Sequence, residues 1–69
     1  MSVYKVIELV GVSPDSWEEA AKSAIEIAAG SVRDLRIAEV ADLDMQIDDG
    51  KVVAYRARVK VSFKHEASV

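Results

Sequence analysis

Apolar and polar residues alternate through the C-terminal part of the chain, from Val52 to Lys64. The odd positions carry the apolar side chains Val53, Tyr55, Ala57, Val59, Val61 and Phe63. The even positions from 56 onward are polar and mostly basic: Arg56, Arg58, Lys60, Ser62 and Lys64. Because side chains alternate between the faces of a strand, the pattern predicts one long two-faced strand, spanning roughly 40 Å. A compact domain of this size has a radius of gyration of about 11 Å, so the strand is expected to curl around the protomer or pair with a neighbouring copy.

A shorter strand and one helix are predicted before it. Val3–Val10 alternates as a strand, and Gly11 leads into a helix start. Ser13 is the predicted N-cap and Pro14 the predicted first helical residue, because proline has no N–H to leave unpaired there. The helix is expected to end at Gly30 or Ser31. Its predicted buried stripe consists of Trp17, Ala20, Ala21, Ala24, Ile27 and Ala28.

A second extended segment is predicted over residues 32–47, followed by a hairpin turn at Asp48-Asp49-Gly50, since Asp-Gly is a strong hairpin signal. The order is therefore β-α-β-β, an α+β fold with a three-stranded antiparallel sheet wrapped around one helix, and residues 1–69 form a single domain. One face of the second segment is expected to carry Leu35, Ile37, Glu39 and Ala41. If this mixed row lies beside the basic row, the outer sheet surface resembles a subunit interface.

The small size of the chain favours self-association. A protein of 7.5 kDa buries only about 60% of its unfolded surface. The sequence has no cysteine for a disulfide, and oligomerisation is the remaining common way to stabilise so small a core. The chain is therefore expected to form a homo-oligomer.

Charge and hydropathy set the other expectations about partners and location. A net charge of −3 and a pI near 5.0 argue against a nucleic-acid partner. The sequence contains no apolar run approaching the roughly 20 residues that a membrane-spanning helix needs. The N-terminus lacks the apolar stretch of a secretory signal. We expect a cytoplasmic protein with no membrane partner.

Few residues suggest reaction chemistry. The only histidine, His65, lies near the C-terminus, there is no cysteine, and the three glycines are scattered. No nucleophile or acid–base pair can be placed, so we expect no enzymatic activity. Asp42, Asp44, Asp48 and Asp49 form an acidic cluster. It is explained either by turn formation and solubility or by a site for a hard cation such as calcium or magnesium.

The chain resembles the dodecins over essentially its full length. The resemblance is carried by Tyr4–Gly11, by Ser13 with the helix after it, by Ala38–Val40, and by Tyr55 with Val59–Phe63. It implies a non-enzymatic β-α-β-β protein that assembles as a hollow dodecamer. It also implies binding of flavins, such as riboflavin or FMN, in pairs at two-fold interfaces.

The resemblance places the flavin-contacting positions at Ile37 and Arg56. In flavin-binding dodecins the first position is a tryptophan that stacks on the ring, and the second is a glutamine that hydrogen-bonds its polar edge. Isoleucine has no aromatic face, and arginine donates hydrogen bonds but does not accept them. The expected ligand site is therefore an altered flavin pocket.

Other segments are closer to the calcium dodecin branch of the family: Ser16-Trp17-Glu18, Asp44-Met45 and Val61–Lys64. In related dodecins, acidic residues at the positions of Asp15 and Asp42 contact divalent cations. Three functions thus stay open: sequestration of a flavin-type ligand at subunit interfaces, binding of calcium or magnesium without flavin, and a purely structural assembly.

Overall fold

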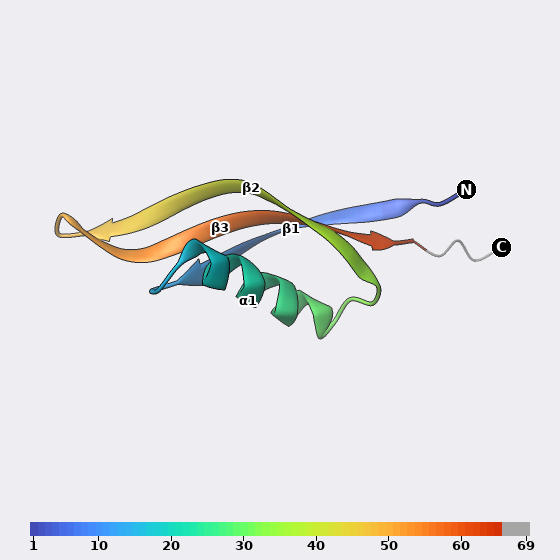
Figure 1. Cartoon of the computed structure of the whole chain (residues 1–69), viewed down its shortest axis with the longest axis horizontal. Helices are drawn as coiled ribbons and strands as arrows, with labels where there is room; N and C mark the ends of the chain where they lie inside the picture. The colour runs from blue at the N-terminus through green and yellow to red at the C-terminus, as the bar shows by residue number, and fades with distance from the viewer. Residues whose placement is uncertain (66–69) are drawn as a thin grey trace.

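The computed structural model of the protein describes residues 1–65. Strand β1 (Tyr4–Ser13) leads into helix α1 (Trp17–Ala29), which is followed by strands β2 (Leu35–Asp48) and β3 (Lys51–Lys64). The sheet has the order β1-β3-β2, and β3 pairs antiparallel with both neighbours. Helix α1 lies along one face of this sheet (Figure 1). The predicted β-α-β-β order, the three-stranded antiparallel sheet and the α+β class are confirmed.

The protomer is elongated rather than round. It measures 55 × 20 × 14 Å, with a radius of gyration of 14.4 Å, compared with about 11 Å for a compact domain of this length. Strand β1 ends where Ser13 pairs with Tyr55. Beyond that row β2 and β3 continue alone as a hairpin arm, residues 46–54, which extends past the helix (Figure 1). The long third strand is therefore covered by its own helix along only part of its length.

The core lies between α1 and the middle of the sheet. Ala57, Val59 and Val61 of β3 and Ala20 of α1 are almost completely buried. The apolar side chains packed around them are Ile7, Leu9, Ala21, Ala24, Ile25 and Leu35. The inner face of the sheet is thus the odd-numbered face of β3 that the sequence predicted to be apolar, and the outer face, on the side away from α1, carries the basic residues. No helix within residues 1–65 has the length and apolar character needed to cross a lipid bilayer.

The helix begins later than the sequence predicted. Ser16 is the N-cap, and its hydroxyl accepts a hydrogen bond of 3.1 Å from the backbone N–H of Glu19. The prediction of Ser13 as N-cap and Pro14 as first helical residue is wrong, because Ser13 is the last residue of β1. Its buried hydroxyl instead accepts a 3.0 Å bond from the backbone N–H of Asp15. Ser13 therefore organises the turn between strand and helix.

The prediction that Ile27 belongs to the buried stripe of the helix is also wrong. Ala20 and Ala28 are buried as expected, but Ile27 is 78% exposed. Ile25 packs against the core instead. The core-facing side of α1 is centred on its alanines, so Ile27 lies at the edge of that side, next to β1. The helix ends at Ala29 with Gly30 as its cap, as predicted.

The second strand contains bulges that the alternation did not reveal. Its pairing with β3 shifts register between Leu35 and Ile37 and again between Val40 and Asp42. Leu35 therefore lies on the inner face and Ile37 on the outer face, so the predicted common face for Leu35, Ile37, Glu39 and Ala41 is wrong. Each bulge inserts one residue and reverses the alternation locally. The outer face of β2 consequently carries Ile37, Glu39, Asp42 and Asp44.

The hairpin turn has the predicted form. Asp48 pairs with Lys51, and the two residues between them have positive φ angles, 49° at Asp49 and 72° at Gly50. Two successive left-handed residues are typical of the type I′ turn that joins twisted antiparallel strands. The Asp-Gly prediction is confirmed.

Candidate functional site

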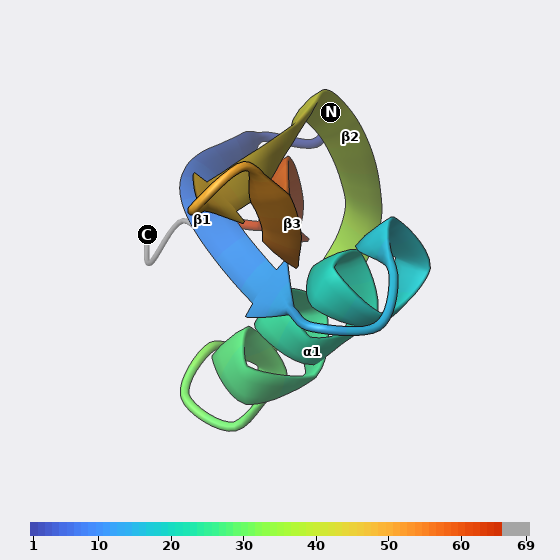
Figure 2. The same ribbon diagram turned by 90° about the vertical axis from the view of Figure 1, so that its left-hand side faces the viewer.

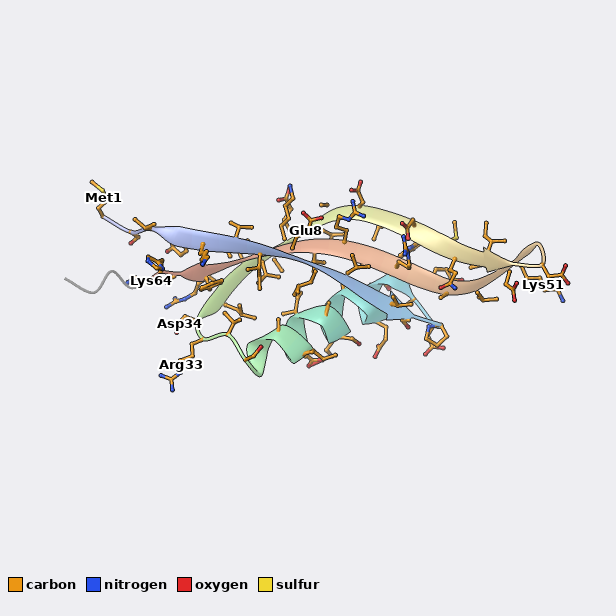
Figure 3. All side chains as sticks on the ribbon, turned by 180° about the vertical axis from the view of Figure 1, so that it is seen from behind. Met1, Glu8, Arg33, Asp34, Lys51 and Lys64 are labelled. Carbon is orange, nitrogen blue, oxygen red and sulfur yellow. The ribbon has the colours of Figure 1, made fainter. Side chains whose placement is uncertain are left out.

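Charged side chains form cross-strand rows on the outer face of the sheet. The basic residues come from the central strand β3, and acidic residues stand opposite them on the edge strands. The rows pair Lys60 with Glu8 and Glu39, Arg58 with Asp42, and Arg56 with Asp44. Glu8 points to the side away from α1 (Figure 3). Opposite charges facing each other across a sheet are favourable. The positive charges of the predicted basic row are therefore largely balanced by acidic residues on the neighbouring strands.

The strongest pair is the one between Arg56 and Asp44. The Nε and Nη2 atoms of Arg56 donate to the two carboxylate oxygens of Asp44 at 2.7 and 2.8 Å. This bidentate arrangement matches the planar guanidinium to the planar carboxylate. The hydrogen bonds from Arg56 lower the pKa of Asp44 below its usual value, and the same bonds raise the pKa of Arg56. The guanidinium of Arg56 is therefore already engaged within the protomer.

Arg58 is held more loosely between two carboxylates. Its guanidinium lies 3.3 Å from Glu8 on β1 and 3.8 Å from Asp42 on β2. The Asp42 side chain is 70% exposed, compared with 50% for Asp44. Asp42 thus offers a largely free carboxylate on the outer face, whereas both oxygens of Asp44 are occupied.

We predict that Arg56→Gln raises the pKa of Asp44 back toward its usual value. The folded-state pKa of Asp44 is depressed, so its contribution to stability is present above the unfolded-state pKa and is lost as the pH falls through the folded-state pKa. The measurement is an NMR titration of the Asp44 carboxyl in wild type and variant. Lys60→Gln, which removes a charge from the same strand without touching Asp44, is the control. An unchanged Asp44 titration in Arg56→Gln would contradict the conclusion that Arg56 lowers the pKa of Asp44.

Trp17 joins the helix start to the strand that carries these acids. Its ring packs edge-on against Tyr55, with centroids 5.1 Å apart and planes at 73°. Its indole Nε1 donates a 2.9 Å hydrogen bond to the backbone carbonyl of Asp44. The sequence predicted Trp17 to be a core residue, and it is half-buried. Local sequence patterns do not predict the hydrogen bond to Asp44, because it joins residues 27 positions apart.

The two residues expected to contact a flavin lie far apart in one protomer. Ile37 is 69% exposed and pairs with Ser62, six residues after Arg56 on β3. At about 3.3 Å per residue the two positions are separated by roughly 20 Å along the strand. Both face the same side of the sheet, but one protomer does not bring them together. A ligand that touches both would need parts of two copies.

The two residues expected to bind a metal do not by themselves form a complete metal site in one protomer. Asp15 is exposed in the connection between β1 and α1, and Asp42 stands on the outer face of β2. Over residues 1–65 no three or more His, Cys, Asp or Glu side chains come together as a metal-binding group. Calcium takes six to eight oxygen ligands, so a cation bound by these residues would need donors from water and from another copy.

Comparison with known proteins identifies the family to which this fold belongs. Residues 3–66 match the family model described as Dodecin. The calcium dodecin of Mycobacterium tuberculosis is 50% identical over 64 residues, which cover 93% of this chain and 90% of that protein. The chain belongs to the dodecin family.

Solved structures agree with the sequence match. Dodecin from Streptomyces coelicolor superposes with a TM-score of 0.90 at 36% identity, covering 97% of this chain and 96% of that one. The crystal structure of the M. tuberculosis calcium dodecin, described as having a novel calcium-binding site, gives a TM-score of 0.83 at 49% identity, covering 99% and 97% of the two chains. The resemblance to the calcium dodecins that the sequence suggested is confirmed.

Proposed function

We propose that this protein is a non-enzymatic, calcium-binding dodecin that acts as a homo-oligomer. The observation that carries the proposal is the exposed Asp42 carboxylate on the outer face, loosely held by Arg58 at 3.8 Å. The 50% identity to a calcium dodecin supports the choice of ion. The altered residues at the flavin positions favour a cation over a flavin as the principal ligand.

The donor set suits a hard cation. Carboxylate oxygens are preferred ligands of calcium and magnesium, and calcium tolerates irregular geometry and mixed protein and water ligands better than magnesium. Asp42 and Asp15 each present an exposed carboxylate, and calcium shared between copies would receive oxygens from both. We therefore propose calcium rather than magnesium as the ion, with Asp42 and Asp15 among its ligands. The cation would hold carboxylates of neighbouring copies together without any chemical conversion.

The second candidate ligand is a flavin, riboflavin or FMN, and we propose that it binds weakly. Ile37 supplies an exposed apolar side chain without an aromatic face. Arg56, at the position that would hydrogen-bond the ring edge, is engaged by Asp44 through two short bonds. Binding a flavin through Arg56 would require weakening that ion pair. We take the assembly to be the dodecamer that family membership suggests.

Calcium should raise the thermal midpoint of the wild-type protein. A ligand present at ten times its dissociation constant stabilises the folded state by about 1.4 kcal/mol, which corresponds to roughly 5–10 °C for a domain of this size. Asp42→Asn should lose most of this gain, because a neutral amide is a poorer calcium ligand than a carboxylate. The measurement is differential scanning calorimetry with calcium or with a chelator.

Asp49→Asn is the matched control, since it removes the same charge at the hairpin tip, where the left-handed φ angle suits asparagine. This control should keep the full calcium gain. An equal gain in wild type and Asp42→Asn would remove Asp42 from the site. A gain with magnesium as large as that with calcium would contradict the proposed ion.

A further inference from the structure

A hydrogen bond from Trp17 ties the start of the helix to the second strand. In the sheet β3 lies between β1 and β2, and α1 lies on one side of this sheet (Figure 2). Trp17 is the first residue of α1, and its indole Nε1 donates to the backbone carbonyl of Asp44 on β2 at 2.9 Å. Among the side-chain hydrogen bonds of residues 1–65, this is the one that joins α1 to β2. Trp17 therefore helps to fix where β2 lies relative to the helix start.

The indole ring is itself held in place by the sheet. It packs edge-on against Tyr55, with ring centroids 5.1 Å apart. Tyr55 pairs with Ser13 of β1 on one side and with Met45 of β2 on the other. The buried hydroxyl of Ser13 accepts a 3.0 Å hydrogen bond from the backbone N–H of Asp15. One row of the sheet thus connects the turn that carries Asp15, the ring of Trp17 and strand β2.

Asp42 directly follows a bulge, and the position of this bulge decides which way its side chain points. The register of β2 shifts between Val40 and Asp42, and a shift of one residue moves a side chain to the other face of the sheet. Two residues further on, Asp44 is held twice, through its carbonyl by Trp17 and through its carboxylate by Arg56. These bonds fix the register beyond the bulge and so keep Asp42 on the outer face.

We propose that Trp17 is a positioning residue for calcium binding, because its hydrogen bond to β2 holds Asp42 and Asp15 in fixed places relative to each other. The inference rests on the calcium-binding function proposed above. Trp17 is not a ligand, since its indole N–H only donates. It acts through the backbone of β2 and through the turn that carries Asp15. Groups outside the ligand shell that orient the ligands contribute to metal affinity, and ligands that are already oriented lose less conformational freedom on binding.

The test compares calcium affinities by isothermal titration calorimetry, well below the thermal midpoint. Trp17→Phe keeps a ring against Tyr55 and removes the N–H donor. It should weaken calcium binding roughly five-fold, which corresponds to the loss of one hydrogen bond. Ile25→Val is the matched control: it loosens the core about two turns further along α1 and should keep the wild-type affinity. In the calcium-free protein, amide hydrogen exchange over residues 42–46 should be faster in Trp17→Phe than in wild type or Ile25→Val.

A second substitution tests whether Trp17 acts through Asp42. Asp42→Glu keeps the carboxylate but displaces it by one methylene, so it should weaken calcium binding by the wild-type protein. In Trp17→Phe the carboxylate is no longer held in place, and the same substitution should cost less affinity. If Trp17→Phe does not fold, benzothienylalanine can be incorporated in place of the one tryptophan of the chain. It keeps two fused rings without the N–H, and the same results are expected.

Equal calcium affinity in wild type and Trp17→Phe would overturn the positioning role and leave calcium binding in place. An equal loss in Ile25→Val would also overturn it, because the loss would then follow from lower stability alone. Strictly additive losses for Trp17→Phe and Asp42→Glu, or unchanged hydrogen exchange over residues 42–46, would show that Trp17 does not act through β2. A wild-type protein that binds no calcium would instead refute the proposed function, and this role with it.

Discussion

Gly11→Ala is expected to destabilise the protein far more than the same methyl addition at Gly30. A Cβ atom at position 11 would overlap the backbone carbonyl oxygen of Ala20 and lie 3.1 Å from the Cβ of Ala24. Neither the helix backbone nor the paired strand can move without disturbing the core around Ala57, which pairs with Gly11. Overpacking of this kind costs about 3 kcal/mol, at the upper end of the usual range. Chemical denaturation measures the loss.

Gly30→Ala provides the control, because it adds the same methyl group where there is more room. A Cβ at position 30 would lie 3.3 Å from the carbonyl oxygen of Ile27, and its φ angle of −70° is open to any residue. The free energy of unfolding of this variant should change by less than about 1 kcal/mol. Equal effects of the two substitutions would contradict the close approach of α1 to β1 at Gly11.

Restoring the flavin-contacting residues should strengthen flavin binding. Ile37→Trp supplies an aromatic face worth about 1 kcal/mol, or roughly five-fold in affinity. Adding Arg56→Gln supplies a group that both donates and accepts, and should increase affinity further. The two gains should not simply add, because both residues would touch one ligand. Quenching of flavin fluorescence on titration measures each affinity.

Ile37→Leu is the matched control, since it keeps an apolar side chain of the same size without a ring, and it should leave flavin affinity unchanged. Arg56→Gln also leaves the carboxylate of Asp44 without its bidentate partner. Riboflavin should therefore gain more than FMN, whose phosphate is repelled by an added free carboxylate. Tight binding of flavin by wild type, with no change in Ile37→Trp, would contradict the assignment of the pocket.

Much of the fold could be predicted from local patterns. The alternation along β3 indicated which side faces the helix, because a single buried face imposes a period of two. The Asp49-Gly50 pair predicted the hairpin, because only a few residue types adopt two successive left-handed conformations. The dodecin resemblance then supplied the family, which the comparisons confirm.

Features that depend on tertiary pairing could not be predicted in the same way. Ser13 and Ser16 are equally good cap residues, and only the extension of β1 to Ser13 decides between them. The bulge between Val40 and Asp42 has no glycine or proline to mark it, yet it turns Asp42 toward the outer face. The pairing of Asp44 with Arg56 depends on that shift of register. The candidate site was thus visible as a set of residue types, but its arrangement was not.

Native mass spectrometry of the wild-type protein, with calcium and after its removal, tests most directly whether the protein is a calcium-binding homo-oligomer. We expect a homo-oligomer of twelve 7.5 kDa chains, the number that the dodecin resemblance implies, carrying bound calcium that is lost in Asp42→Asn and retained in Asp49→Asn. A monomer at micromolar concentration, or an oligomer that binds no calcium, would contradict this expectation.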